Sequence, residues 1–428
     1  MTEIIYPKYR WFVLITMFLV TAASLAIMIA PTPFAGEISK DLKVDLGVVL
    51  AATMMVFVLS TALSALVGGF IIDRIGLVPM WIICSVVAIV ATALFPVFGH
   101  TLKGLIVLRI VQGLVNGPIS SSITTCCAQW FKYSERTYVA GVQGFSVSIG
   151  MAVGVVYAPA FFNVTHSWQI ALAWTAVLPA IGLIFALIVH FGPKAPNLAG
   201  ASEGTGNQAM FSGDFKKAVT FITFYVLCLM GFIDSWCQQA YNDMANGFYA
   251  VARPVGLGLG PMGAGSKLVY ASYAMAIGTL CAPVITEKIF KGNPKPTIFI
   301  GCGIAGLLVL TVRSLHPDNT ALLILIPCGI LFFSSFVNPT VYGYISKHYP
   351  STISGRIGGL VMGLTIFGAT VGLGVSSALL HKTGFYWASM NVLAAVTLFG
   401  AVAVLALRLP KGFNVAEDES NRPKSALV

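Results

Sequence analysis

Long apolar stretches alternate with short polar segments along the whole chain. A helix needs about 20 mostly apolar residues, within a range of about 17–25, to cross the hydrocarbon core of a bilayer, and twelve stretches are long enough. The pattern predicts membrane-spanning helices over 11–36, 46–72, 79–98, 104–128, 138–162, 169–191, 217–241, 267–290, 296–313, 320–346, 355–380 and 385–408. We therefore expect an all-α integral membrane protein with twelve transmembrane helices.

The predicted helices form two groups of six. The segment between them, 192–216, is rich in Gly, Ala, Ser, Asn and Pro, a composition typical of a flexible linker. The expected organisation is an N-terminal six-helix bundle (1–191), a cytoplasmic linker (192–216), a C-terminal six-helix bundle (217–410) and a cytoplasmic tail (411–428).

The two groups share a weak internal repeat at an offset of 218 residues. Small residues at four-residue spacing let helices approach closely in lipid, where packing rather than water exclusion drives association. The repeat pairs Trp130-Phe131 with His348-Tyr349, and Gly150 and Gly154 with Gly368 and Gly372. A shared offset favours two similar halves, a plan found in transporters, over chance.

Composition supports lipid as the main solvent. Charged residues make up 9% of the chain, against roughly 25% in soluble proteins. The formal net charge is +10. With the N-terminus inside, seventeen of the 25 Lys and Arg fall in segments predicted to be cytoplasmic and seven fall outside. This bias predicts both termini in the cytoplasm of a bacterial inner membrane, and it explains much of the basic charge without nucleic acid.

The sequence offers little for cofactors, metals or catalysis. All eight Cys lie in apolar runs without paired CxxC spacing, so we interpret them as buried free thiols. The fragment Gly256-Leu-Gly-Leu-Gly260 lacks the βαβ unit of a nucleotide site, and no P-loop is present. We expect no cofactor, no metal site and no catalytic residue, and therefore not an enzyme.

Three motifs carry a family resemblance. Gly69-Phe-Ile-Ile-Asp73-Arg74-Ile-Gly76 follows the second predicted helix, Arg109-Ile-Val-Gln112-Gly113 lies in the fourth, and Trp130-Phe131 precedes Arg136 after it. Together, in this order, they resemble the major facilitator superfamily over the whole chain. The subfamily is not identified.

The resemblance implies two pseudo-symmetric bundles that expose a central cavity alternately to each side. It also implies that Gly69, Asp73, Arg74, Gly76 and Arg136 gate the cytoplasmic side. The chain departs from the family pattern where Leu77-Val78-Pro79 replace the usual basic residues. That difference implies a weaker cytoplasmic closure than the family pattern gives.

Two ionisable residues lie deep in predicted helices, Arg109 and Asp234. Such residues are costly in a bilayer and usually serve a function. Both fall at similar depth, and the resemblance places their helices at the cavity. A guanidinium fits a carboxylate, so Arg109 is the candidate for binding an anion, with a structural helix–helix tie as the alternative. Asp234 is the candidate for proton coupling, with Arg109 as its nearby cation; an outer-gate cap is the alternative.

Polar residues on the predicted cavity helices complete the candidate site. Their alternative role is to satisfy backbone groups that prolines leave free. The candidates beside Arg109 are Thr32 in the first helix, Gln112 and Asn116 in the fourth, Gln238 and Gln239 in the seventh, and Ser334 and Asn338 in the tenth.

These features predict a secondary active transporter for a small, monocarboxylate-like organic anion, driven by proton symport. The expected partners are the substrate, protons and membrane lipid, and we expect a monomer. A sugar or polyol carrier is the first alternative, because Gln238-Gln239 followed by Asn242 is faintly like a run in sugar porters. A drug/proton antiporter is less favoured, because Met151 rather than Pro follows Gly150. A membrane sensor that binds without transporting is the alternative from another class.

Overall fold

The computed structural model describes residues 7–44, 48–49, 51–195, 215–251, 253–254 and 256–408. These residues are mostly helical and contain no β-strand. Most of the predicted linker (196–214) and the predicted tail lie outside the described residues.

The first half contains nine described α-helices and the second half seven. The first set is α1 (Arg10–Ile29), α2 (Ala35–Leu42), α4 (Val56–Ile75), α5 (Leu77–Ala93), α6 (Phe95–Phe98), α7 (Leu102–Trp130), α8 (Arg136–Thr165), α9 (Trp168–Trp174) and α10 (Val177–Phe191). The second set is α12 (Ile222–Ala250), α13 (Gly260–Val284), α14 (Pro294–Thr311), α15 (Thr320–Ser334), α16 (Val337–His348), α17 (Ser351–Thr383) and α18 (Tyr386–Ala403). Short π-helical turns occur at η2 (Ala51–Met55) and η4 (Ile285–Ile289), and 3₁₀ turns at η1 (Thr32–Phe34), η5 (Val312–Ser314) and η6 (Val404–Ala406).

Some consecutive helical segments continue one another and form a single span, such as α15 and α16 over Thr320–His348. We call each such span, whether one helix or several, a rod. The described part of the chain has twelve rods, and they match the twelve predicted spans. In the described part of the chain, ten helical stretches are long and apolar enough to cross a membrane, and α5 is a shorter apolar helix. The twelfth rod is α12, whose interior carries Asp234, Gln238 and Gln239 in an otherwise apolar run. The chain is therefore an all-helical, multi-pass integral membrane protein.

Several helix ends differ from the predicted ones because proline and serine act locally. The first helix ends at Ile29 rather than at 36, since Pro31 and Pro33 have no N–H to continue the backbone ladder. The chain turns through η1 into the separate helix α2. The predicted span 320–346 is broken after Ser334, where Ser334 and Ser335 donate to the preceding carbonyls of Leu331 and Phe332.

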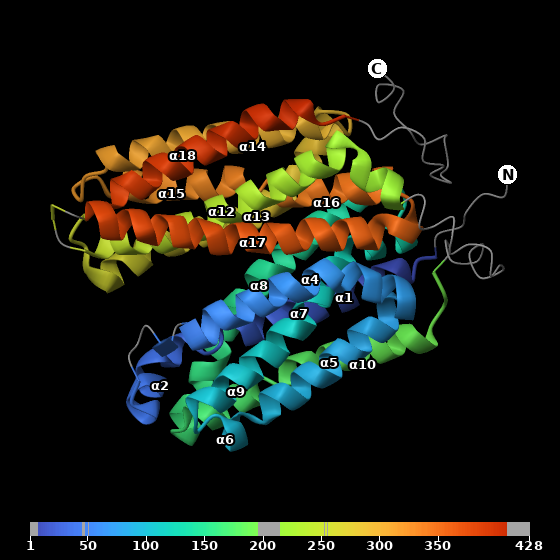
Figure 1. Cartoon of the computed structure of the whole chain (residues 1–428), viewed down its shortest axis with the longest axis horizontal. Helices are drawn as coiled ribbons and strands as arrows, with labels where there is room; N and C mark the ends of the chain where they lie inside the picture. The colour runs from blue at the N-terminus through green and yellow to red at the C-terminus, as the bar shows by residue number, and fades with distance from the viewer. Residues whose placement is uncertain are drawn as a thin grey trace.

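The rods form two bundles, α1–α10 and α12–α18 (Figure 1). The bundles meet near α4, α8, α16 and α17 and diverge toward the opposite end, where α2, α6 and α9 lie. We call the end with the start of α1 and the end of α4 the proximal end, and the opposite end the distal end.

The two bundles repeat the same helix packing. Adding a Cβ to Gly150 or Gly154 on α8 would clash with the backbone of Ala22 or Ala26 on α1. A Cβ at Gly368 on α17 would likewise clash with the Phe232 backbone on α12, and one at Gly372 with Trp236. In each bundle, the glycines of the sequence repeat therefore allow two helices to approach closely, α8 and α1 in the first and α17 and α12 in the second.

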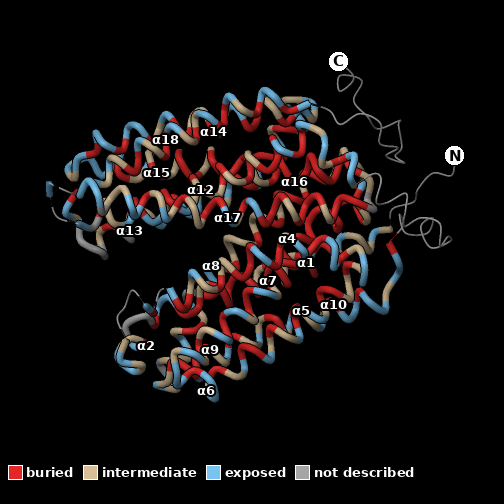
Figure 2. The backbone as a smooth tube through the Cα atoms, viewed as in Figure 1, coloured by how far each residue is buried: buried red, intermediate tan, exposed pale blue. Residues whose placement is uncertain are grey.

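Burial follows the helix contacts. Figure 2 shows buried backbone concentrated where helices face one another and exposed backbone along the outer faces. Large apolar side chains are exposed on those outer faces, among them Phe191, Ile184, Leu325 and Val402. Such a surface suits lipid rather than water.

Candidate functional site

Side chains of the two bundles contact each other at the proximal end, and we call the ion pairs and hydrogen bonds between the bundles ties. Asp73, near the end of α4, accepts a hydrogen bond from Nε of Arg356 on α17 at 2.6 Å. Close helix approach makes this ion pair possible, because a Cβ at Gly69 would clash with the Gly355 backbone. Arg74 points to the exposed surface, and Gly76 ends α4 with φ +91°, a conformation that favours glycine.

A second set of ties joins α8 to the other bundle. Arg136 is buried and donates to the backbone oxygens of Ser346, Phe131 and Ala128. Thr137 donates to Glu287 at 2.6 Å. Glu287 also pairs with Lys347 of its own bundle, with Nζ and Oε1 2.5 Å apart.

The two sets of ties are pseudo-symmetric and lie at the same depth. Asp73 and Glu287 each lie where the second rod of a bundle ends, and each contacts a residue in the first two turns of the opposite bundle's fifth rod. The predicted gating residues Gly69, Asp73 and Arg136 therefore lie at the contact between the bundles, whereas Arg74 and Gly76 lie beside it. Sequence reasoning missed Glu287, Lys347 and Arg356 as members.

Arg109 lies inside the first bundle. Its side chain is fully buried and donates four hydrogen bonds, to the backbone oxygens of Thr53, Ile27 and Met28 and to Oε1 of Gln112, at 2.6 to 3.0 Å. Its guanidinium carbon also lies 4.5 Å from the centroid of the Phe57 ring. All of these partners are neutral.

The local sequence explains why an arginine stands here. In a continued helix, Ile27 O would accept from the N–H of residue 31, but Pro31 has none. Thr53 belongs to the π-helical turn η2, where the backbone ladder is also irregular. Arg109 replaces the missing donors, and so it joins α1, η2 and α7.

Gln112 and Asn116 extend this buried network along α7. Gln112 donates to Thr92 on α5 at 2.9 Å. Asn116 accepts from Ser24 on α1 and donates to Thr61 on α4 at 3.3 Å. The structure thus brings Arg109, Gln112 and Asn116 together between α1, α4, α5 and α7.

Asp234 lies inside the second bundle. It is 1% exposed; Gln238 donates to Oδ1 at 2.9 Å, and Oδ2 has no hydrogen-bond partner in the described part of the chain. Arg109 is not among its partners, so the structure does not show the expected Arg109–Asp234 pair. Among the described residues no cation pairs with the buried Asp234 carboxylate, so its charged form is costly there and binding of a proton removes that cost.

The other predicted residues divide between the second bundle and the distal end. Asn338 on α16 is half-buried, and its Oδ1 has no partner. Ser334 is buried and bonded to its own helix. Thr32 is exposed in η1, beyond the end of α1, and contacts the Met54 sulfur at 3.6 Å.

One face of α12 is polar and open. The helix packs against α13, α16, α17 and α18, which cover its apolar side chains such as Cys237, Ala240 and Met244. A stripe of polar side chains at helical spacing is exposed or half-buried instead: Ser235, Gln239, Asn242 and Asn246. We call it the α12 polar stripe. A polar stripe of this length avoids lipid, so it suits contact with water or a polar ligand.

The sequence contained the signal for this stripe. Positions 235, 239, 242 and 246 follow the i, i+4, i+7, i+11 pattern of a single helix face. Sequence reasoning singled out Gln238 and Gln239 as neighbours in the chain. The structure instead separates them, because Gln238 turns inward to Asp234 while Gln239 is exposed.

No group of three or more His, Cys, Asp or Glu side chains in the described ranges could hold a metal ion. The eight Cys are unpaired thiols, six of them buried.

The chain matches the family model described as Major Facilitator Superfamily over residues 12–364. Two similar curated proteins are a hexuronate transporter of Bacillus subtilis and a protein of Cupriavidus necator named "Probable sulfoacetate transporter SauU". The first is 20% identical over 397 residues, covering 88% of this chain and 90% of that protein. The second is 24% identical over 388 residues, covering 84% of each.

Solved structures share the fold. The proton:xylose symporter XylE aligns with a TM-score of 0.74 at 13% identity, covering 97% of this chain and 99% of that one. The Escherichia coli fucose:proton symporter FucP gives 0.71 at 15% identity, covering 94% and 98%. The human organic anion transporter MFSD10 gives 0.68 at 14% identity, covering 93% and 100%.

Proposed function

Because the chain belongs to the major facilitator superfamily, whose members are transporters, we propose that it is a secondary active transporter of a small organic anion. It works by alternating access and couples transport to protons. It acts as a monomer in a bacterial inner membrane, with the proximal end in the cytoplasm. The described conformation, tied at the proximal end, then faces outward.

The charge of Arg109 is the observation that carries the proposal. Its partners in the structure are neutral oxygens, so the charge is solvated but not cancelled. In a low-dielectric medium an uncancelled charge acts over a longer distance than in water. Arg109 therefore attracts an anion to the distal half of the first bundle while it keeps its hydrogen bonds to the backbone oxygens.

The α12 polar stripe supplies the hydrogen bonds that such a substrate needs. Amide and hydroxyl groups donate to and accept from hydroxyl, carboxylate and sulfonate oxygens. The two similar curated proteins carry the names of a sugar acid and a sulfonated acid, and both substrates are oxygen-rich organic anions. This class suits the site better than a simple apolar monocarboxylate.

Asp234 is the proposed proton site. A proton on Asp234 removes a buried charge, and release of that proton requires water or a cation to reach the carboxylate. Gln238 bonds Asp234, and the adjacent Gln239 belongs to the open stripe. A substrate that contacts Gln239 on the stripe therefore lies next to Gln238, which bonds Asp234. We propose that substrate binding affects the protonation of Asp234 through Gln238, and not through Arg109.

A neutral sugar or polyol is the second candidate. Its support is that the four side chains that define the α12 polar stripe are uncharged, that the exposed charged residue beside them, Asp243, is an anion, and that fold neighbours include xylose and fucose symporters. Arg109 distinguishes the candidates, because its charge favours an anion and gives a neutral sugar no advantage.

Ligand-induced stabilisation of the purified protein tests the proposal. A ligand that binds the folded state and not the unfolded state raises the unfolding temperature, by more at higher ligand concentration relative to its Kd. Glucuronate and glucose form a matched pair that differs in a carboxylate at one carbon. We expect hexuronates or sulfoacetate to stabilise the protein, and glucose to have no effect. Equal stabilisation by glucose and glucuronate would favour the sugar carrier.

A further inference from the structure

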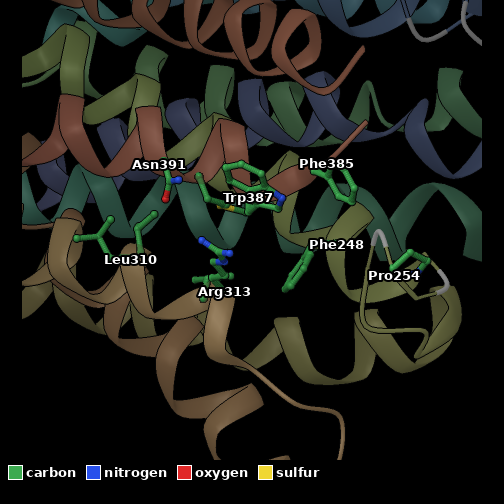
Figure 3. A pocket seen from close by; sticks show the side chains of 10 residues that line it. Phe248, Pro254, Leu310, Arg313, Phe385, Trp387 and Asn391 are labelled. Atoms are coloured by element: carbon green, nitrogen blue, oxygen red, sulfur yellow. The ribbon is translucent and has the colours of Figure 1, made fainter. Parts of the chain in front are cut away.

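A cavity of about 210 Å³ lies at the distal end of the second bundle. Its walls come from the ends of α12 and α14, from η5 and from the start of α18 (Figure 3). The lining includes Phe248, Leu310, Arg313, Phe385, Trp387 and Asn391. The α12 polar stripe does not line it, so the cavity is separate from the proposed substrate site.

Arg313 is the charged group of this cavity. It is exposed in η5, and its guanidinium carbon lies 5.2 Å from the centroid of the Trp387 ring. Within the described ranges no carboxylate pairs with it. Stacking on a ring leaves the N–H edge of a guanidinium free, and Figure 3 shows Arg313 reaching toward Trp387, with Asn391 beside it.

The surroundings are amphipathic along the membrane normal. Leu310, Phe385 and Trp387 are all more than a third exposed at the cavity. One turn further into α14 from Leu310, the apolar side chain of Leu307 is exposed as well. The helices α14 and α18 pack together closely, since a Cβ added at Gly306 of α14 would clash with the Leu398 side chain of α18. The Arg313 guanidinium therefore lies next to an apolar, lipid-accessible surface on α14.

The position along the helices matches the headgroup level of a bilayer. Arg313 follows the last turn of α14, and Trp387 lies in the first turn of α18. Trp is enriched at this level because its ring is apolar and its N–H is polar. No side chain caps the N-terminus of α18, so the positive end of that helix adds to the potential from Arg313.

We propose that this cavity binds the headgroup of an anionic phospholipid. The phosphodiester oxygens accept from the free edge of Arg313 and from the Asn391 amide. The first carbons of one acyl chain lie over Leu310 and continue along Leu307. The headgroup fills the space between Trp387 and Phe248, and so the lipid fastens the distal ends of α14 and α18.

Native mass spectrometry of the purified protein tests the site. The probes are phosphatidylglycerol and phosphatidylcholine with identical acyl chains, and glycerol phosphate as the free headgroup. We expect one phosphatidylglycerol to be retained more tightly than phosphatidylcholine. Arg313→Gln should weaken that binding about fivefold, the factor expected for one basic side chain at a membrane surface.

Two further variants show whether a loss of lipid binding comes from the charge of Arg313 or from a general loss of positive charge. Lys103→Gln removes an exposed positive charge from the distal end of the other bundle, and should leave the binding unchanged. Arg313→Lys keeps the charge and should retain most of it, which also shows that the position tolerates substitution. Equal losses in Arg313→Gln and Lys103→Gln, or equal retention of the two lipids, would overturn the proposal. Competition by glycerol phosphate as strong as that of the whole lipid would assign the site to a soluble anion instead.

Discussion

Arg109 and Asp234 are the two deeply buried ionisable side chains of the proposed mechanism, and their surroundings differ. Arg109 has four hydrogen bonds to neutral oxygens. Asp234 has one, and one of its oxygens has none. A buried charge whose hydrogen-bonding atoms all have partners can contribute to a stable structure. A buried carboxylate that lacks such partners carries a desolvation cost, and protonation removes that cost. The two residues should therefore respond to substitution in opposite ways.

Arg109→Gln should lower both stability and anion binding. It leaves the carbonyl oxygens of Thr53, Ile27 and Met28 short of donors, which predicts a loss of at least ~3 kcal/mol at about 1–3 kcal/mol for each buried unsatisfied group. Arg109→Lys keeps the charge but cannot reach all three carbonyls. Thermal unfolding and glucuronate binding are the measurements. If folded Arg109→Gln binds glucuronate as well as wild type does, the charge of Arg109 has no part in binding.

Asp234→Asn should keep the fold and uncouple transport from protons. The substitution preserves size and removes a charge that lacks a cation, so the unfolding temperature should not fall. Substrate exchange should continue, while accumulation driven by a pH gradient stops and the pH dependence of uptake flattens. Asp318→Asn removes an exposed carboxylate in a distal loop of the same bundle; it is the control and should behave as wild type. Accumulation by Asp234→Asn at the wild-type level would exclude it as the coupling site.

The sequence predicted the depth of both residues but not their partners. Apolar flanks are enough to predict that Arg109 and Asp234 lie within the membrane. The bonds of Arg109 depend on carbonyls that Pro31 and the η2 turn leave free, and these lie more than fifty residues away in the chain. Such contacts follow from how helices are assembled, and a linear pattern does not contain them.

At the scale of helices, glycine spacing decides where the two bundles touch. Gly69 on α4 and Gly355 and Gly359 on α17 bring two backbones together at the proximal end. The Asp73–Arg356 and Thr137–Glu287 contacts add charge and hydrogen bonding to that approach. Opening of the proximal end therefore requires both the helix packing and the polar ties to release.

Asp73→Asn should shift the protein toward the state that is open at the proximal end. A partly exposed ion pair contributes about 0.2–1 kcal/mol, so the population should change by up to about fivefold. Cys126 is buried on α7 and follows Thr125, whose Oγ1 lies beside Gly355 of α17 at this contact; its rate of labelling by a membrane-impermeant thiol reagent from the proximal side is the readout. Asp318→Asn, in an exposed distal loop, should not change the rate. An unchanged rate in Asp73→Asn would leave this residue without a gating role.

Gly359→Val should prevent closure at the proximal end. A Cβ at Gly359 would meet the backbone of Gly69 and Ala65, which cannot move aside as a side chain could. Gly374→Val on the same helix is the matched control, because a Cβ there has nothing within 4 Å. We expect faster labelling of Cys126 in Gly359→Val alone. Equal labelling in the two variants would show that the α4–α17 approach does not set the conformation.

Helix number could be predicted because it depends on length and hydropathy alone. Helix ends were less accurate, since Pro31 and Pro33 shorten the first helix and the serines at 334 and 335 divide the tenth span. The glycine repeat was correctly linked to close helix packing, because that function is local and recurs in both halves.

The whole molecule joins two bundles with different tasks in the proposed mechanism. The first bundle holds the positive charge in a rigid buried network, and the second carries the open polar stripe and the buried carboxylate. A substrate between them contacts both, and its release follows when the proximal ties open and the distal faces close. The cavity at Arg313 lies outside this path and belongs to the lipid-facing surface.

Transport by proteoliposomes tests the central claim most directly. Purified protein is reconstituted, an inward proton gradient is imposed, and uptake of labelled glucuronate, sulfoacetate, lactate and glucose is followed. The account predicts that at least one of the organic anions accumulates above its external concentration, that a protonophore abolishes the accumulation, and that glucose is not taken up. Proton-driven accumulation of glucose without that of any organic anion would contradict it, as would saturable binding of an anion with no uptake.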